Sequence, residues 1–373
     1  MIKIISIYTV IKYCLFILIF SSSFILFYNQ VFNNYPSDLR AHIGFIPEII
    51  NGKFASHPMF HYLTYFFQKI TTVSISLSGV FVNSFLVLLL SILVYKISFY
   101  FIKEKNKYVN LLIVLLVMYS GTFFIPGLGL TKYQYLGNGS ISVWHNVTLY
   151  MVYPFAFVSF FMFFYAIDKN YNMKLLFLSL FLAILSIFAK PSFIVVFLPM
   201  IILYLIYEVY KNKFTNKNIL IYAILLTLFS IINGTYGIEE KSNVIIAPFK
   251  VWKLYSENIL ISIIVANLFI LLFFVTNYKY LTKRSIFSSI MFIGSILLFL
   301  LFAEEGSRFT HGNFGWSYIL MMKLSYFSIL IDYINNYKTI SKFNKTLLNT
   351  ALLIHLICGI YYFSIIFRGG GYA

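Results

Sequence analysis

The sequence has few charged residues, very few acids and almost no cysteine. Only 10% of its 373 residues are charged, 11 are acidic and two are cysteines. Both cysteines, Cys14 and Cys358, lie inside apolar segments, so no disulfide framework is expected. This low charge, with 61% hydrophobic residues and a mean hydropathy of +0.87, excludes a soluble globular domain. The composition predicts a polytopic membrane protein.

Apolar segments long enough to form membrane helices recur along the whole chain. A span needs about 20 mostly apolar residues, so we expect an all-α bundle of about eleven transmembrane helices that forms one membrane domain over residues 1–373. The expected helices cover residues 10–29, 73–96, 108–126, 148–167, 174–189, 192–210, 218–236, 257–277, 285–303, 317–337 and 346–367. Lys3 and Lys12, beside the first of them, are typical of an uncleaved signal anchor.

Lysine and arginine are distributed unevenly over the expected loops. One set of alternate loops, together with the amino terminus, holds 17 basic and four acidic residues, whereas the other set holds ten and seven. Cytoplasmic loops of membrane proteins carry the basic excess. The net charge of +17 therefore indicates a cytoplasmic face and no nucleic-acid partner. We expect a multi-pass protein of the bacterial inner membrane with a cytoplasmic amino terminus.

Most remaining ionisable groups fall in loops of the opposite, extracytoplasmic face. The first such loop, residues 30–72, contains a short amphipathic segment in which Ser37 or Asp38 is a suitable helix cap. Asp38 and His42 are four positions apart and share one face of that helix. The apolar side chains expected on the membrane surface are Leu39, Ile43 and Ile46. Pro47 should end or kink this interfacial helix, because it lacks a backbone donor.

A second group of charges lies in the outer loop of residues 304–316. Its ionisable residues are Glu304, Glu305, Arg308 and His311. Adjacent carboxylates repel, so we expect one of them to pair with the arginine or with a divalent cation such as Mg²⁺ or Mn²⁺. Lys323, in the following helix, has a side chain long enough to reach back toward this loop.

Two further loops contain candidate residues. Residues 127–147 combine turn, aromatic and hydrogen-bonding side chains, a composition that suits either a sugar site or an interfacial anchor. The Asn138-Gly-Ser and Asn146-Val-Thr triplets match the glycan acceptor pattern, which is frequent by chance in an asparagine-rich chain. Lys190, followed by Pro191, is costly at the bilayer centre and is expected in a turn near one face.

These features together resemble the GT-C glycosyltransferases. The matching residues are Asp38 with His42, the Gly52…His57-Pro58…His61-Tyr62 stretch and the Ala189-Lys190-Pro191 turn. The similarity covers the architecture and roughly the first 200 residues. The paired acidic signature of better-known members is absent, because Leu39 follows Asp38. The resemblance implies transfer of a sugar from a polyprenyl-phosphate carrier to a glycan or lipid acceptor, in cell-surface polysaccharide synthesis.

In such a reaction Asp38 would accept the proton of the acceptor hydroxyl, with His42 as its catalytic partner. Cationic side chains would stabilise the departing phosphate. The candidate substrate-binding residues are Arg308, His311, Lys190, Lys323, Trp144, Trp316 and His61, and the candidate metal ligands are Glu304 and Glu305.

Two other functions remain open at this stage. An O-antigen or capsule-type polysaccharide polymerase or ligase would need more outer arginines than Arg40, Arg308 and Arg368. A lipid or glycan transporter would need ionisable residues in the middle of several helices, where Lys323 and His355 are the main examples.

Overall fold

The computed structural model describes residues 6–53, 55, 57–103, 106–123, 137–212, 217–236 and 243–371. This part of the chain is mostly helical and includes one antiparallel two-stranded sheet. Its elements are α1 (Ile7–Phe32), α2 (Leu39–Ile50), α3 (Met59–Thr71), α4 (Ile75–Phe101), α5 (Lys107–Tyr119), α6 (Val147–Asp168), α7 (Met173–Ala189), α8 (Ile194–Asn212), α9 (Lys217–Tyr236), β1 (Val244–Ile246), α10 (Lys250–Tyr255), α11 (Ile259–Ala266), α12 (Leu268–Asn277), η1 (Tyr278–Tyr280), α13 (Lys283–Leu301), β2 (Phe302–Glu304), η2 (Gly306–His311), α14 (Gly315–Asn335) and α15 (Lys342–Phe367).

Seven of the described helices are long and apolar enough to cross a membrane. They are α1, α4, α6, α8, α13, α14 and α15. An eighth span results if α11 and α12, which meet at an angle of 75°, are counted as one broken helix. The chain is therefore a multi-pass helical protein whose apolar helices require a lipid bilayer.

The expected count of eleven spans is not confirmed. Each expected segment contains helix, but α5, α7 and the Lys217–Ile232 part of α9 are shorter than a span. The 13 residues of α5 rise about 20 Å against a hydrocarbon core of about 30 Å. This helix ends because Ser120 is extended and the N–H of Gly121 donates to the carbonyl of His355 in α15. Apolar composition does not record where such tertiary contacts stop a helix.

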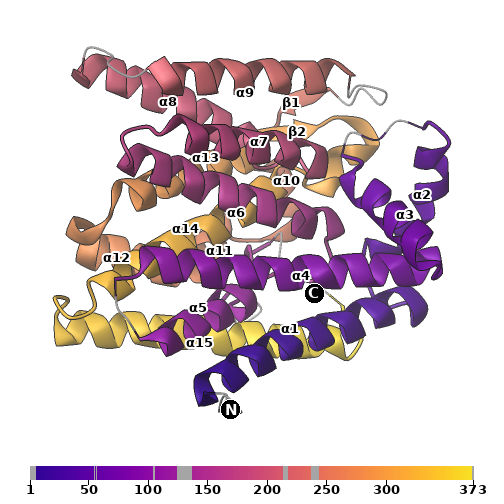
Figure 1. Ribbon diagram of the computed structural model, residues 1–373, viewed down its shortest axis with the longest axis horizontal. Coiled ribbons are helices and arrows are strands. Elements are labelled where there is room, and N and C mark those ends of the chain that lie inside the picture. The colour runs from indigo at the N-terminus through magenta and orange to yellow at the C-terminus, as the bar shows by residue number, and fades with distance from the viewer. Residues whose placement is uncertain are drawn as a thin grey trace, which may run out of the picture.

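The loops gather at two opposite ends of the bundle (Figure 1). At one end, on the left of the view, the turn after α14 lies. There Asn335 accepts a hydrogen bond from the backbone N–H of Lys103 and donates to the carbonyl of Phe101. At the other end lie α2, α3 and the sheet, in which Val244 pairs with Glu304. The sheet ties the segment before α10 to the 304–316 loop.

The short helix expected in the first outer loop is present as α2, but it differs from the prediction. Pro47, expected to end or kink the helix, lies inside its last turn and does not end it, because the helix continues to Ile50. The apolar face packs on the protein and not on the membrane surface, since Leu39, Ile43 and Ile46 are at most 6% exposed. Ile43 reaches the backbone of Gly79 in α4, where a Cβ atom would lie 2.5 Å from its side chain. Packing against α4 thus fixes the position of α2 on the bundle.

Candidate functional site

Asp38 connects the start of α2 to the start of α6. Its backbone N–H donates to the carbonyl of His145 at 3.3 Å, and its Oδ1 atom accepts the N–H of Val147 at 3.1 Å. The side chain does not cap its own helix; instead Ser37 Oγ accepts the N–H of Leu39 at 3.0 Å. Asp38 therefore satisfies one of the donors that the first turn of α6 leaves unpaired. Its second carboxylate oxygen is left for other partners.

Lys190 ends α7 and places its ammonium against the same turn of α6. The backbone leaves the helix at this residue with a φ of −172°. Nζ donates to Asn146 Oδ1 at 3.1 Å and to Thr148 Oγ1 at 2.8 Å. It also lies 4.8 Å from the centre of the Trp316 ring, within the range of a cation–π interaction. Lys190 is only 9% exposed, so these contacts hold a buried positive charge at one end of the bundle.

Three histidines lie next to Asp38. His42 Nε2 is 3.9 Å from Asp38 Oδ2, and His42 Nδ1 is 3.2 Å from His61 Nε2. The ring of His57 lies 6.5 Å from that of His42. Burial and neighbouring groups lower the pKa of His42 and His57 to about 3, and burial lowers the pKa of His61 to about 4. All three rings are therefore neutral near pH 7 and can each donate and accept a proton.

Asp38, His42, His61, Lys190 and Trp316 form one contiguous group, here called the rim cluster. Its carboxyl is accessible, since 29% of the Asp38 side chain is exposed, yet protein atoms remove water from its other sides. This desolvation raises the pKa of Asp38 to about 7, although the Lys190 charge and the N–H of Val147 oppose the shift. Burial lowers the pKa of Lys190 to about 8, against the opposing charge of Asp38. Both groups titrate close to neutral pH, as acid–base catalysts do.

The 304–316 loop lies beside the rim cluster. Arg308 Nε is 3.1 Å from Glu304 Oε2, and Asn313 donates to the same oxygen. The positive charge of Arg308 contributes to lowering the pKa of His57. Trp316, directly after this loop, lies against Lys190. Arg308 retains 35% exposure, so it can still meet a ligand.

The two candidate metal ligands do not fit a divalent cation. Glu304 is engaged by Arg308 and Asn313, whereas Glu305 faces away and accepts from Asn243 at 3.0 Å. Within the described residues, no group of three or more histidine, cysteine or acidic side chains could hold a metal ion. Divalent cations of this kind prefer several oxygen ligands. In this structure the guanidinium of Arg308 neutralises Glu304.

Trp144 is not at the surface of the site. It is 1% exposed and packs against Tyr119 and Phe363, with ring centres 5.5 and 4.7 Å away. Its role is to fill the space between α5, α6 and α15, so it offers no free face for a sugar. Trp316 is the tryptophan that contacts the rim cluster.

Lys323 and His311 also lie apart from the rim cluster. Lys323 does not reach back to the 304–316 loop; its Nζ atom lies 5.1 Å from the centre of the Tyr153 ring, inside the bundle. The side chain is 1% exposed and forms no hydrogen bond or ion pair with another described residue. His311 is exposed at the end of η2, and none of the described contacts joins it to Asp38.

The structure adds residues that the sequence did not single out. Asn146 caps α6 and, with Thr148, holds Lys190, so the triplet that matched a glycan acceptor contributes to the site. His145 supplies the carbonyl that accepts from Asp38. The positions of these residues in the sequence did not predict these roles. Of the loop predicted as a sugar site, residues 124–136 lie outside the described ranges.

Comparison with known proteins adds no family to this geometry. No model of a known protein family matches the chain, and a comparison with curated proteins found no relative.

Proposed function

We propose that the protein is a membrane glycosyltransferase of the GT-C type. It moves a sugar from a polyprenyl-phosphate-linked donor to a glycan or lipid acceptor in cell-surface polysaccharide synthesis. The rim cluster is its catalytic centre and faces the extracytoplasmic side of a bacterial inner membrane, and the lysine-rich end faces the cytoplasm. The carrier lipid lies in the outer leaflet and presents its phosphate to the rim.

The observation that supports this proposal most strongly is that Asp38 and Lys190 both bind the start of α6, through Val147 and through Asn146 with Thr148. An accessible carboxyl with a pKa near 7 and a buried ammonium act on each other at one end of a membrane bundle. A structural carboxylate on a surface needs neither the desolvation nor the cation. Ionisable groups of opposite charge with perturbed pKa values that lie close together are typical of catalytic sites.

The reaction needs one proton acceptor and one site for developing negative charge. The acceptor oxygen forms a bond to the anomeric carbon of the sugar as the bond from that carbon to the phosphate oxygen breaks. Asp38 takes the proton of the acceptor hydroxyl, and His42, whose side chain is 18% exposed, passes it to water. The 3.9 Å between Asp38 and His42 is long for a hydrogen bond and would shorten around a substrate.

The departing polyprenyl phosphate carries the electrons of the broken bond. Lys190, within the rim cluster, and Arg308, in the neighbouring 304–316 loop, are cations that can stabilise this charge. The two cations differ in their exposure. Arg308 is partly exposed and can bind two phosphate oxygens at once, whereas Lys190 is held by the side-chain oxygens of Asn146 and Thr148. Trp316 is itself buried, at 7% exposure, and supports this step by holding Lys190 in place.

Two alternatives use parts of the same structure. A polysaccharide polymerase or ligase would use the same proton acceptor and differ only in a lipid-linked oligosaccharide donor. A lipid or glycan transporter is favoured by one observation, the buried Lys323 inside α14, because ionisable residues within membrane spans often line a substrate path.

The direct test is sugar transfer by the purified protein in proteoliposomes. Polyprenyl-phosphate donors with radiolabelled sugars are supplied together with lipid and glycan acceptors. The proposal expects labelled product and free polyprenyl phosphate in equal amounts. Movement of intact donor across the vesicle membrane without any product would support the transporter hypothesis and contradict the transferase hypothesis.

A further inference from the structure

An open pocket lies toward the opposite end of the bundle from the rim cluster. It has a volume of about 610 Å³ and is lined by α6, α8, α13 and the turn after α6. This volume lies within the range of sites that hold small organic ligands. The 19 residues of α8 span about 28 Å, and Lys190 lies just before the first of them, so the two sites are separated by roughly one bilayer core.

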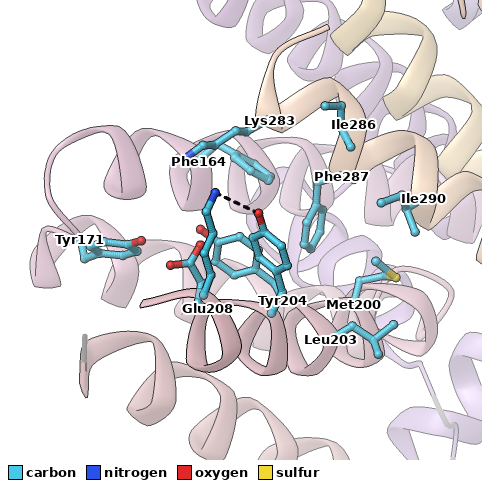
Figure 2. A pocket seen from close by; sticks show the side chains of 12 residues that line it. Phe164, Tyr171, Met200, Leu203, Tyr204, Glu208, Lys283, Ile286, Phe287 and Ile290 are labelled. Atoms are coloured by element: carbon cyan, nitrogen blue, oxygen red, sulfur yellow. Dashed lines mark hydrogen bonds between the residues drawn. The ribbon is translucent and has the colours of Figure 1, made fainter. Parts of the chain in front are cut away.

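The cavity has a polar end and an apolar end (Figure 2). On one side of the view lie Tyr171, Glu208 and Lys283. On the other lie Met200, Leu203, Phe287 and Ile290. A water-soluble ligand would leave the apolar side chains unmatched, and a pure hydrocarbon would leave the charges unmatched. The shape and polarity fit an amphiphile.

The charges at the polar end favour an anion. Lys211 and Lys283 both line the cavity, against the single carboxylate of Glu208. Lys211 donates to the hydroxyl of Tyr207 at 3.2 Å. Lys283 is exposed and forms no hydrogen bond or ion pair within the ranges that the structure describes. One ammonium is thus available, a second is held nearby, and the pair exceeds the acidic charge by one.

We propose that this cavity binds an anionic glycerophospholipid of the cytoplasmic leaflet, which lies at the lysine-rich face of the protein. The phosphate lies between Lys211 and Lys283, and an acyl chain runs along the apolar end past Leu203 and Phe287. Basic pockets between membrane helices on the cytoplasmic side are suited to anionic headgroups. The bound lipid fills the space between α8 and α13 and contacts both helices.

The test compares lipids on the delipidated full chain by native mass spectrometry. Phosphatidylglycerol is expected to remain bound as one molecule, and phosphatidylcholine is expected to be lost at lower collision energy. The double variant Lys211→Gln/Lys283→Gln should lower phosphatidylglycerol affinity about fivefold per lysine removed. Glycerol 3-phosphate, which has the headgroup chemistry without acyl chains, should not bind.

Two further variants separate this site from unspecific lipid contact. Lys279→Gln, at an exposed lysine of η1 outside the cavity, should leave the lipid preference unchanged. Leu203→Trp should fill the apolar end and displace the lipid; its side chain is 55% exposed, so the change does not disturb the core. Equal retention of both lipids, or equal loss in Lys279→Gln and the double variant, would overturn the proposal in favour of a nonselective acyl-chain groove. Retention of phosphatidylglycerol by Leu203→Trp would place the lipid elsewhere.

Discussion

Asp38 accepts the backbone N–H of Val147 at 3.1 Å, although 109 positions separate the two residues. This bond gives one oxygen of the carboxyl a structural role and leaves the other toward His42. It also ties the start of α2 to the start of α6, where Lys190 is held. Asp38 therefore has a structural role, as the acceptor for Val147, and a proposed role as proton acceptor. The substitution Asp38→Asn separates the two roles.

Asp38→Asn should abolish glycan assembly while the protein remains folded. The amide oxygen can still accept from Val147, but the side chain can no longer take a proton. General-base catalysis contributes about 10²–10⁴-fold, so the transfer rate should fall by that factor. Glu48→Gln is the matched control, since this exposed carboxylate on the same helix pairs only with Lys53 at 2.7 Å in the described contacts. Wild-type rates in Asp38→Asn, with normal membrane insertion, would remove Asp38 from the mechanism.

The transfer rate should depend on pH as a bell-shaped curve. It should rise as Asp38 ionises near pH 7 and fall as Lys190 loses its proton near pH 8. Lys190→Arg should flatten the alkaline side, because a guanidinium remains charged at these pH values. The measurement is kcat/KM against pH for both proteins. An alkaline side that is identical in Lys190→Arg would mean that another group controls it.

The fold should lose stability in mild acid because of its buried histidines. Burial lowers the pKa of His42, His57 and His145 to about 3 and of His61 to about 4. The unfolded chain binds protons near pH 6.5, whereas the folded chain does not until far lower pH. Their contribution is therefore complete above pH 6.5 and is lost as pH falls toward 4.

Thermal unfolding at pH 7.5 and pH 5 measures this effect. His61→Gln should reduce the difference in Tm between the two pH values, because one proton-binding group is gone from the unfolded chain. His311→Gln, at an exposed histidine outside the rim cluster, serves as the comparison. A larger difference in His61→Gln than in the wild type would contradict the assignment.

The two tryptophans should respond differently to substitution. Trp144→Ala removes a fully buried ring, so it should lower the free energy of unfolding by about 3–5 kcal/mol. Trp316→Leu keeps apolar volume but removes the ring beside Lys190, so it should raise KM for the donor with a smaller effect on Tm. Unfolding in denaturant and steady-state kinetics check the pair. A KM effect in a stable Trp144→Phe variant, with none in Trp316→Leu, would reverse the assignment.

Lys323→Met should leave sugar transfer intact. Trp316 and Lys323 are seven positions apart in α14, so the lysine lies about 10 Å deeper than the rim cluster. Removing a buried charge that has no ion-pair partner among the described residues should also raise Tm, because intramembrane charges are costly. Loss of function in a folded Lys323→Met protein would instead support the transporter.

The sequence predicted several parts of this structure from local chemistry. The apolar segments gave the helices, because burial of 20 apolar residues in lipid hardly depends on their neighbours. The scarcity of ionisable groups drew attention to Asp38, His42 and Lys190 before their arrangement was known. It did not give the length of α5, because the contact of Gly121 with His355 decides where that helix ends.

What the sequence determined by itself was the class of protein, because transfer of apolar side chains from water is a property of composition. Only the tertiary structure decided which polar groups meet. Asp38, Asn146 and Lys190 lie on three separate helix ends, and packing of α2, α6 and α7 sets their distances. Packing also makes Trp144 a core residue and Trp316 a partner of Lys190. The sequence does not distinguish these roles, because both residues are tryptophans in outer loops.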